Sequence, residues 1–132
     1  MAERHFTREE ATALLEEVRP VAEALVAHRR ALTVAAARRA MITARISGNG
    51  GDFDPQEPRE LDEQLEREAE AVKRAVEQLQ RLGVLVKDLD RGLVDFPAIR
   101  DGEEVYLCWI DGETDIGFWH HLDAGYTGRQ PL

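Results

Sequence analysis

The first two thirds of the chain show one repeating pattern of apolar and polar positions. Apolar residues recur at alternating intervals of four and three from Leu14 to Ile46, and again from Leu61 to Leu82. This heptad spacing predicts helices that pack along a narrow seam. The predicted seam positions are Leu14, Val18, Val21, Leu25, His28, Leu32, Ala35, Arg39, Ile42 and Ile46, then Leu61, Leu65, Glu68, Val72, Ala75, Leu79 and Leu82. Two seams joined by a short turn predict an antiparallel helical hairpin over residues 7–83.

Local signals mark the start of the first helix and a break within it. Thr7 and Glu10 have the spacing of a capping box, in which each side chain accepts a hydrogen bond from the other residue's backbone amide. Pro20 lies inside the heptad pattern, where proline removes a hydrogen bond and clashes with the preceding turn. We therefore expect a kink or a restart at Pro20, with a short helix before it and a long helix after it.

The two helices should be joined by a glycine-rich tip. Residues 47–52 contain three glycines, one serine, one asparagine and one aspartate, which is typical of a flexible turn. A phosphate-binding loop is disfavoured, because neither Lys-Ser nor Lys-Thr follows and no strand precedes the stretch. The second helix should begin near Pro55 to Pro58 and end at Gly83, a natural C-cap.

After Gly83 the pattern changes to short strands and tight turns. Residues 84–122 predict an antiparallel meander of three or four strands, with a two-residue hairpin at Asp101-Gly102. Residues 123–132 are expected to form an irregular tail. The predicted fold is therefore α+β: a single domain over residues 1–132, with the helical hairpin packed on the antiparallel sheet.

The turns also predict which residues face each other across the sheet. The hairpin at Asp101-Gly102 places Asp95 opposite Cys108, and a turn centred on Glu113 places Tyr106 opposite His120. Since side chains alternate along a strand, two faces result. One face is apolar and should pack on the helices: Val94, Phe96, Val105, Leu107, Trp109 and Trp119. The other, which we call the mixed face, holds Asp95, Pro97, Tyr106, Cys108, Phe118 and His120.

Composition narrows the classes of partner and compartment. The formal net charge of the 132-residue chain is -9, which disfavours nucleic acid and anionic membranes as partners. The single cysteine, Cys108, cannot form an intramolecular disulfide, which fits a reducing compartment. The N-terminus lacks the apolar core of a signal peptide, and no apolar run reaches the roughly 20 residues that span a bilayer. These features predict a cytoplasmic protein.

Several short motifs in the C-terminal half are shared with one known family. They are Lys87-Asp88, Gly92-Leu93-Val94-Asp95-Phe96-Pro97, Leu107-Cys108-Trp109, Gly112-Glu113, Trp119-His120 and Gly128-Arg129-Gln130-Pro131, with Phe6-Thr7 and Glu10-Ala11 at the start. With these motifs the chain resembles the small prokaryotic family called domain of unknown function 2203. The residue after Trp-His is often acidic in that family, and His121 departs from this pattern. Only His120 is therefore carried over as a motif position, and the resemblance implies no particular activity.

The mixed face carries the candidate chemistry. Asp95, Cys108 and His120 are residue types that ligate Zn²⁺ or Fe²⁺, and a histidine beside a cysteine can also hold it as a thiolate nucleophile. In the plainer interpretation Cys108 is a small buried hydrophobe and His120 hydrogen-bonds Tyr106 or a carboxylate. Further candidate residues on this surface are Tyr106, Glu113, Phe118 and Arg129. Glu113 is expected to be solvated or a further ligand, and Arg129 to bind an anion or clamp the sheet edge.

The composition of the helical hairpin predicts that the chain self-associates. Alanines at positions 35, 36, 37 and 40 allow close helix approach, so two hairpins could form a four-helix bundle in a homodimer. The polar seam residues predict an ion pair between Arg39 and Glu68.

The favoured function is a small cytoplasmic oligomeric binding or scaffold protein assembled through the hairpin. One alternative is a metal-binding protein, with or without enzymatic activity, that uses Asp95, Cys108 and His120. The other is a small-molecule sensor that uses the same face.

Overall fold

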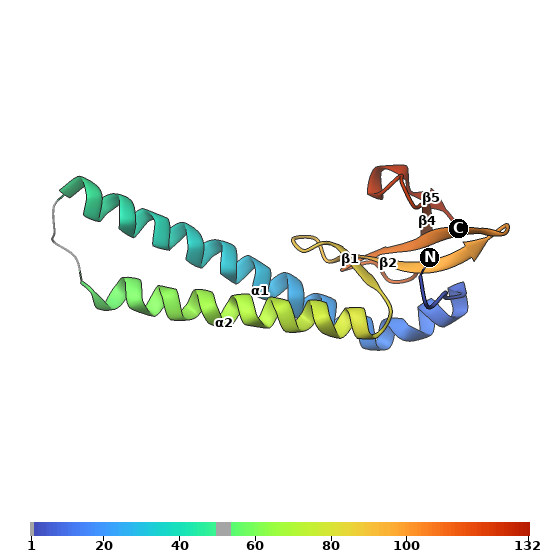
Figure 1. The fold of residues 1–132 in the computed structure, drawn as a ribbon, viewed down its shortest axis with the longest axis horizontal. Coiled ribbons are helices and arrows are strands. Elements are labelled where there is room, and N and C mark those ends of the chain that lie inside the picture. The colour runs from blue at the N-terminus through green and yellow to red at the C-terminus, as the bar shows by residue number, and fades with distance from the viewer. Residues whose placement is uncertain (1, 50–53) are drawn as a thin grey trace.

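The computed structural model describes residues 2–49 and 54–132. Its elements in chain order are α1 (Arg8–Asn49), α2 (Gln56–Arg81), β1 (Leu85–Asp88), β2 (Leu93–Arg100), β3 (Glu103–Ile110), β4 (Phe118–His121), η1 (Tyr126–Gly128) and β5 (Gln130–Pro131). The two helices form a hairpin whose far end projects away from the sheet (Figure 1). The strands form one antiparallel sheet in the order β1-β2-β3-β4-β5. The predicted α+β fold is confirmed.

The start of α1 follows the predicted capping box, but its course past Pro20 does not follow the predicted restart. The Thr7 amide donates to Glu10 Oε1 at 2.9 Å, and the Glu10 amide donates to Thr7 Oγ1 at 3.0 Å. The helix then continues through Pro20 without a break, although its ribbon changes direction in the blue segment of Figure 1. Val18 and Ala22 are fully buried on either side, so tertiary packing holds the helix across the missing hydrogen bond.

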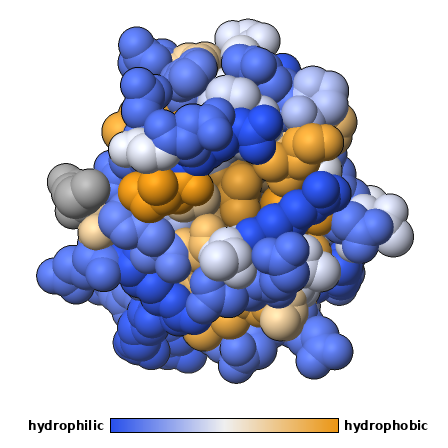
Figure 2. All heavy atoms as spheres, turned by 90° about the vertical axis from the view of Figure 1, so that its right-hand side faces the viewer, coloured by the Kyte–Doolittle hydropathy of each residue, from blue (hydrophilic) through white to orange (hydrophobic). Residues whose placement is uncertain are grey.

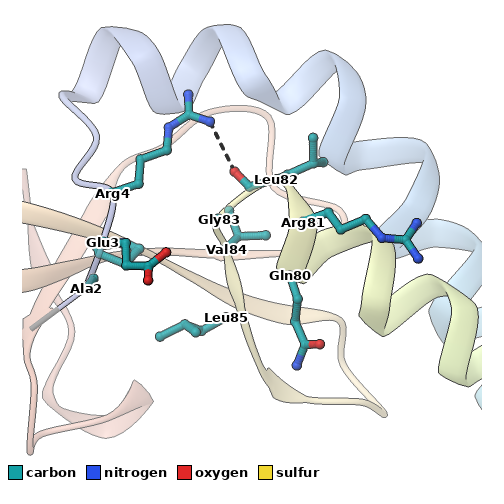
Figure 3. Close-up of a pocket in the computed structure, with 10 residues that line it drawn as sticks. Ala2, Glu3, Arg4, Gln80, Arg81, Leu82, Gly83, Val84 and Leu85 are labelled. Atoms are coloured by element: carbon teal, nitrogen blue, oxygen red, sulfur yellow. Dashed lines mark hydrogen bonds between the residues drawn. The ribbon is translucent and has the colours of Figure 1, made fainter.

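The ends of the hairpin differ slightly from the predicted ones. Helix α1 extends to Asn49, so the first three residues of the predicted turn 47–52 are helical, while residues 50–53 lie outside the described part of the chain. Helix α2 ends at Arg81, and Gly83 follows with a φ of +93°, as the predicted C-cap requires. The Arg4 guanidinium donates to the carbonyl of Leu82 across this end (Figure 3).

The seam between the helices buries most of the predicted apolar positions, but the predicted Arg39–Glu68 pair is wrong. Arg39 instead donates to Asp62 Oδ1 at 2.8 Å, and Glu68 lies 2.6 Å from His28 Nδ1. The register explains the difference. Ile42 and Leu61 share one buried cluster, so at 1.5 Å per residue Glu68 lies about 6 Å farther along the seam than Arg39.

The sheet register agrees with the prediction. Asp95 pairs with Cys108 and Tyr106 with His120, and the hairpin residues Asp101 and Gly102 have φ values of +52° and +80°. These values suit the tight turns that match the twist of a hairpin. All six residues of the predicted apolar face belong to the main core together with Leu15, Leu25 and Leu79.

The tail is more ordered than predicted. Residues 123–132 contain the 3-10 turn η1 and the short strand β5, which pairs with β4 and adds a fifth strand to the three or four expected. The Leu132 amide also donates to the carbonyl of Gly117. In Figure 1 this red segment lies on the side of the sheet opposite the blue start of α1. The tail therefore covers the mixed face, while the helices cover the apolar face.

The N-terminal segment extends the sheet edge beside β2. The Phe6 amide donates to the carbonyl of Pro97 at 2.7 Å, and His5 Nε2 lies 2.6 Å from Glu104 Oε2. Since a residue's N–H and C=O point to the same side of a strand, Pro97 places its missing donor at this outer edge, where no ladder bond to β3 is lost. At the sheet end of the molecule, hydrophobic residues reach the surface and are surrounded by hydrophilic ones (Figure 2).

Candidate functional site

Three adjacent strands bring Asp95, Cys108 and His120 together. Asp95 stands on β2, Cys108 directly opposite it on β3, and His120 on β4, where it pairs with Tyr106. One ligand atom from each of the three residues lies within 4.8 Å of the other two. Asp95 is 1% exposed, Cys108 0% and His120 2%. The predicted convergence of the three side chains is therefore present, and we call them the Asp-Cys-His cluster.

The hydrogen bonds of His120 fix where its protons lie. Nδ1 is 2.7 Å from the carbonyl oxygen of His121, and Nε2 is 3.0 and 3.1 Å from the two carboxylate oxygens of Asp95. A carbonyl oxygen carries no hydrogen, so Nδ1 must be the donor. The contact between Nε2 and Asp95 then holds one proton, which the imidazole and the carboxyl share. The pair has no net charge, whichever partner carries that proton.

The cluster is a poor setting for a cysteine nucleophile. Burial, with the nearby negative charge of Asp95, raises the pKa of the Cys108 thiol to about 12. Burial likewise raises the pKa of Asp95, although the neighbouring His120 and Lys87 oppose that rise. A thiol with so high a pKa stays protonated at neutral pH, and the thiolate is the reactive form. The alternative of a Cys–His nucleophile pair is therefore disfavoured by the surroundings of Cys108.

Aromatic and basic side chains enclose the cluster. The Tyr106 ring packs edge-on against the His120 ring at 5.5 Å between centroids, and Lys87 Nζ lies 4.7 Å from the Tyr106 ring centre. Lys87 comes from β1; it belongs to the shared Lys87-Asp88 motif, but it was not among the predicted site residues. The Tyr106 ring thus contacts both the Lys87 ammonium group and the imidazole, and it limits the orientations that His120 can adopt.

The tail is held over the cluster by Arg129. Its guanidinium lies 3.9 Å from the centre of the Phe118 ring, and Phe118 stands opposite Cys108. Arg129 Nη2 also donates to both carboxylate oxygens of Glu113, at 2.7 and 2.9 Å. Of the two roles predicted for Arg129, its contacts match the clamp. Glu113, predicted to be solvated or a further ligand, also accepts a hydrogen bond from the Ile110 amide, and its side chain is 27% exposed, so it is only partly solvated.

Tyr126 is a site residue that the sequence pattern did not single out. It belongs to η1, and the guanidinium carbons of Arg91 and Arg129 lie 4.5 and 5.1 Å from its ring centre. Arg91 follows β1, so Tyr126 spans from the tail to the opposite edge of the sheet. An aromatic residue three positions before Arg129 was the only signal available for it, and in a segment expected to be irregular that signal is weak.

A surface pocket of about 370 Å³ lies elsewhere, between the N-terminal segment and the end of α2 (Figure 3). Arg4, Arg81, Gly83 and Pro97 are among its lining residues, and none of the three cluster residues is. The described residues that line this pocket include no convergent set of catalytic or metal-ligating side chains. The Asp-Cys-His cluster is therefore the better candidate site.

The comparisons with known proteins agree with the motifs. A family model described as "Uncharacterized conserved protein (DUF2203)" matches residues 4–132, nearly the whole chain. Neither the curated proteins nor the solved structures gave a match. Within the described residues, no helix has the length and apolar character needed to cross a membrane. The chain therefore belongs to the DUF2203 family.

Proposed function

We propose that this protein binds a divalent transition-metal ion, Zn²⁺ or Fe²⁺, through Asp95, Cys108 and His120. The observation that supports the proposal is the convergence of three different ligand atoms, an oxygen, a sulfur and a nitrogen, within 4.8 Å of one another in a buried part of the sheet. Each ligand comes from its own strand. A rigid sheet holds such ligands more accurately than loops can.

The ligand types suit zinc best. Zn²⁺ binds sulfur at about 2.3 Å, imidazole nitrogen at about 2.0 Å and carboxylate oxygen at about 2.0–2.2 Å, in tetrahedral geometry. Tetrahedral ligand atoms at those lengths are about 3.3–3.6 Å apart. The widest separation in the cluster, which is at most 4.8 Å, would therefore shorten by about 1 Å, and the 3.0 Å contact between His120 Nε2 and Asp95 would open slightly. Three protein ligands leave a fourth position, which a water molecule or a small anionic ligand would occupy.

Charge balance also supports an ion at this place. The cluster holds two exchangeable protons, one on the Cys108 thiol and one shared by His120 and Asp95, and is neutral overall. A divalent cation that displaces both protons leaves a thiolate, a carboxylate and a neutral imidazole around two positive charges. That state is also neutral, so the ion adds no uncompensated charge to a buried region, which would otherwise be costly.

The contacts around the cluster suit a metal site in two further ways. His120 already donates Nδ1–H to a backbone carbonyl, which is the second contact that metal-ligating histidines usually make and which leaves Nε2 for the ion. The tail clamp of Arg129 and Glu113 closes the face over Cys108. An ion would then enter when the tail opens. A thiolate ligand also fits a reducing compartment, and we keep the cytoplasm as the proposed location.

Metal content and a spectroscopic replacement test the proposal. Untagged protein purified without chelator is expected to contain close to one zinc or iron ion per chain, measured by inductively coupled plasma mass spectrometry. Metal-free protein titrated with Co²⁺ should develop a thiolate-to-cobalt charge-transfer band that saturates at one equivalent. Cys108→Ala should abolish that band, because this chain has only one cysteine.

Matched variants separate a metal role from a packing role. His120→Ala and Asp95→Asn should lower Co²⁺ affinity by at least tenfold. The exposed neighbours His121→Ala and Asp90→Asn should leave it unchanged. A folded wild-type protein that contains no metal and gives no cobalt band would overturn the proposal. The cluster would then be the closed polar network of the plainer interpretation.

A further inference from the structure

Arg129 carries a buried hydrogen-bond donor that the described part of the chain does not satisfy. Its side chain is 11% exposed, and its Nε atom is buried without an acceptor among the described residues. Another nitrogen of the same guanidinium, Nη2, donates to both carboxylate oxygens of Glu113. A buried N–H group without a partner is costly, and in native proteins such a group commonly contacts a bound water molecule or ion. Nε–H therefore indicates a further group that binds beside Arg129.

The guanidinium of Arg129 lies over the mixed face, next to the Asp-Cys-His cluster. It stacks on the Phe118 ring at 3.9 Å, and Phe118 stands directly opposite Cys108. Phe118 and His120 are alternate residues of β4, so their side chains share one face and their Cα atoms are about 7 Å apart. The charge of Arg129 also reaches the thiol, because it opposes the rise that burial causes in the pKa of Cys108. A group bound at Nε would thus be a neighbour of an ion held by the cluster.

The basic residues around this face leave one positive charge without a partner. Three of them contact aromatic rings there, and two are already paired: Arg129 with Glu113, and Arg91 with Asp88. The third, Lys87, forms no ion pair within 4.0 Å with any other described residue. The cluster with a divalent ion is neutral. A single bound negative charge would therefore be balanced, as a charge in a buried region requires.

We infer that the fourth position on the metal ion is taken by a small monoanion with two oxygen atoms, a carboxylate or a similar oxyanion. One oxygen binds the ion, and the other accepts the hydrogen bond of Arg129 Nε–H. The inference rests on the proposed metal site, because the ion supplies one of the two anchors of the anion. The unsatisfied donor and the charge of Lys87 together define the class of ligand as small, anionic and oxygen-bearing.

A water molecule is the competing occupant of this position. A single water oxygen would have to reach both the ion and Nε, whereas the two oxygens of a carboxylate divide these contacts between them. The step of about 7 Å between Phe118 and His120 along β4 favours the longer group. Water would also leave the charge of Lys87 without a partner. Both observations favour the anion.

Titration of the Co²⁺-loaded protein with formate tests the inference. A carboxylate that replaces water on cobalt changes the visible ligand-field bands. These bands should shift in wild type and saturate at one formate per ion, while the thiolate-to-cobalt band persists. Formamide, which has a similar shape and no charge, should leave the spectrum unchanged.

The possible failures are distinguishable. A cobalt-loaded protein whose spectrum does not respond to formate would overturn the anion and leave the metal proposal standing. An equal response to formamide would also overturn the anion, because charge would then play no part. A protein that gives no cobalt band at all would overturn both proposals.

Two variants separate anion binding from the tail clamp. Arg129→Met removes the donor and the charge, and should lower formate affinity at least tenfold without loss of the cobalt band. Glu113→Gln also breaks the ion pair, but it keeps the guanidinium and an oxygen for the Ile110 amide. It should therefore bind formate at least as tightly as wild type. Equal losses in the two variants would mean that the clamp, and not Nε–H, supports binding, which would overturn the inference.

The two lysines of the chain form a matched pair for the charge argument. Both Lys87 and Lys73 are exposed, and Lys73 lies on α2. Lys87→Gln should weaken formate binding about threefold, the size expected for one partly screened charge. Lys73→Gln should leave the affinity unchanged. The same affinity in both variants would overturn the charge balance on which the choice of an anion rests.

Discussion

His120 Nε2 lies 3.0 Å from one carboxylate oxygen of Asp95 and 3.1 Å from the other, although the two residues are on strands separated by β3. Both side chains reach across the central strand, beside Cys108. This contact ties β2 to β4 independently of the backbone ladder. It is also the reason that the mixed face can bury a carboxyl and an imidazole without leaving either unpaired.

The first prediction is that removing one member of this pair destabilises the fold. His120→Ala leaves the Asp95 carboxyl buried without its partner, and breaking a buried pair costs about 3–5 kcal/mol. His121→Ala, on the exposed side of the same strand, should cost less than about 0.5 kcal/mol. Urea unfolding of metal-free protein measures both. Equal losses for the two histidines would contradict a structural role for the pair.

The second prediction concerns the pH dependence of stability. The folded state keeps the thiol proton of Cys108 up to a pKa of about 12, whereas the unfolded chain loses it near the ordinary value of 9.0. The unfolded state therefore binds fewer protons between these values. The stabilisation is complete below pH 9 and is lost as the pH rises toward 12, by at most about 1.4 kcal/mol per pH unit.

Comparison with Cys108→Ala isolates that effect, because lysines and tyrosines titrate in the same range. The neighbours that influence the thiol, Asp95, Arg129 and Glu113, are unchanged in the variant. The free energy of unfolding should fall more steeply for wild type than for the variant above pH 9. Parallel curves would show that the thiol ionises as readily in the folded state as in the unfolded chain.

The third prediction is that the tail controls access to Cys108. Arg129→Ala removes the ion pair with Glu113 and the contact with Phe118, so the tail should open more often. The rate at which Cys108 reacts with a thiol reagent under native conditions should rise at least tenfold. Arg100→Ala, which removes an arginine stacked on Trp119, is the matched control and should leave the rate unchanged. No acceleration in the Arg129 variant would mean that the tail does not limit access.

The fourth prediction concerns the close approach of the sheet to α1 at Gly92. This glycine has a φ of +65°, and a Cβ placed there would lie 2.8 Å from Val26 Cγ2 and 2.9 Å from Asp111 Cβ. Gly92→Ala should therefore cost about 2–4 kcal/mol through backbone strain and overlap. Gly102 has a similar φ of +80° but open space around it. Gly102→Ala should cost only about 1–2 kcal/mol, and thermal unfolding compares the two.

The sequence determined the features that depend on local periodicity and turn chemistry. Heptad spacing sufficed for the two helices, because a repeat of four and three buries one stripe whatever the partner is. The Asp101-Gly102 turn sufficed for the register of β2 and β3, since a two-residue hairpin leaves one alignment. That register placed Asp95 opposite Cys108, and the second turn placed His120 on the same face.

Tertiary structure decided what depends on contacts between distant segments. Helix α1 continues through Pro20 because the burial of Val18 and Ala22 stabilises it by more than one lost hydrogen bond costs. The local sequence pattern carries no information about that burial. Arg39 pairs with Asp62 rather than Glu68 because the longitudinal offset of the helices is set by packing, not by the seam spacing. The tail closes over Cys108 through Arg129, Glu113 and Tyr126. Its order comes from partners far away in the chain, so a segment with no periodicity of its own could not reveal it.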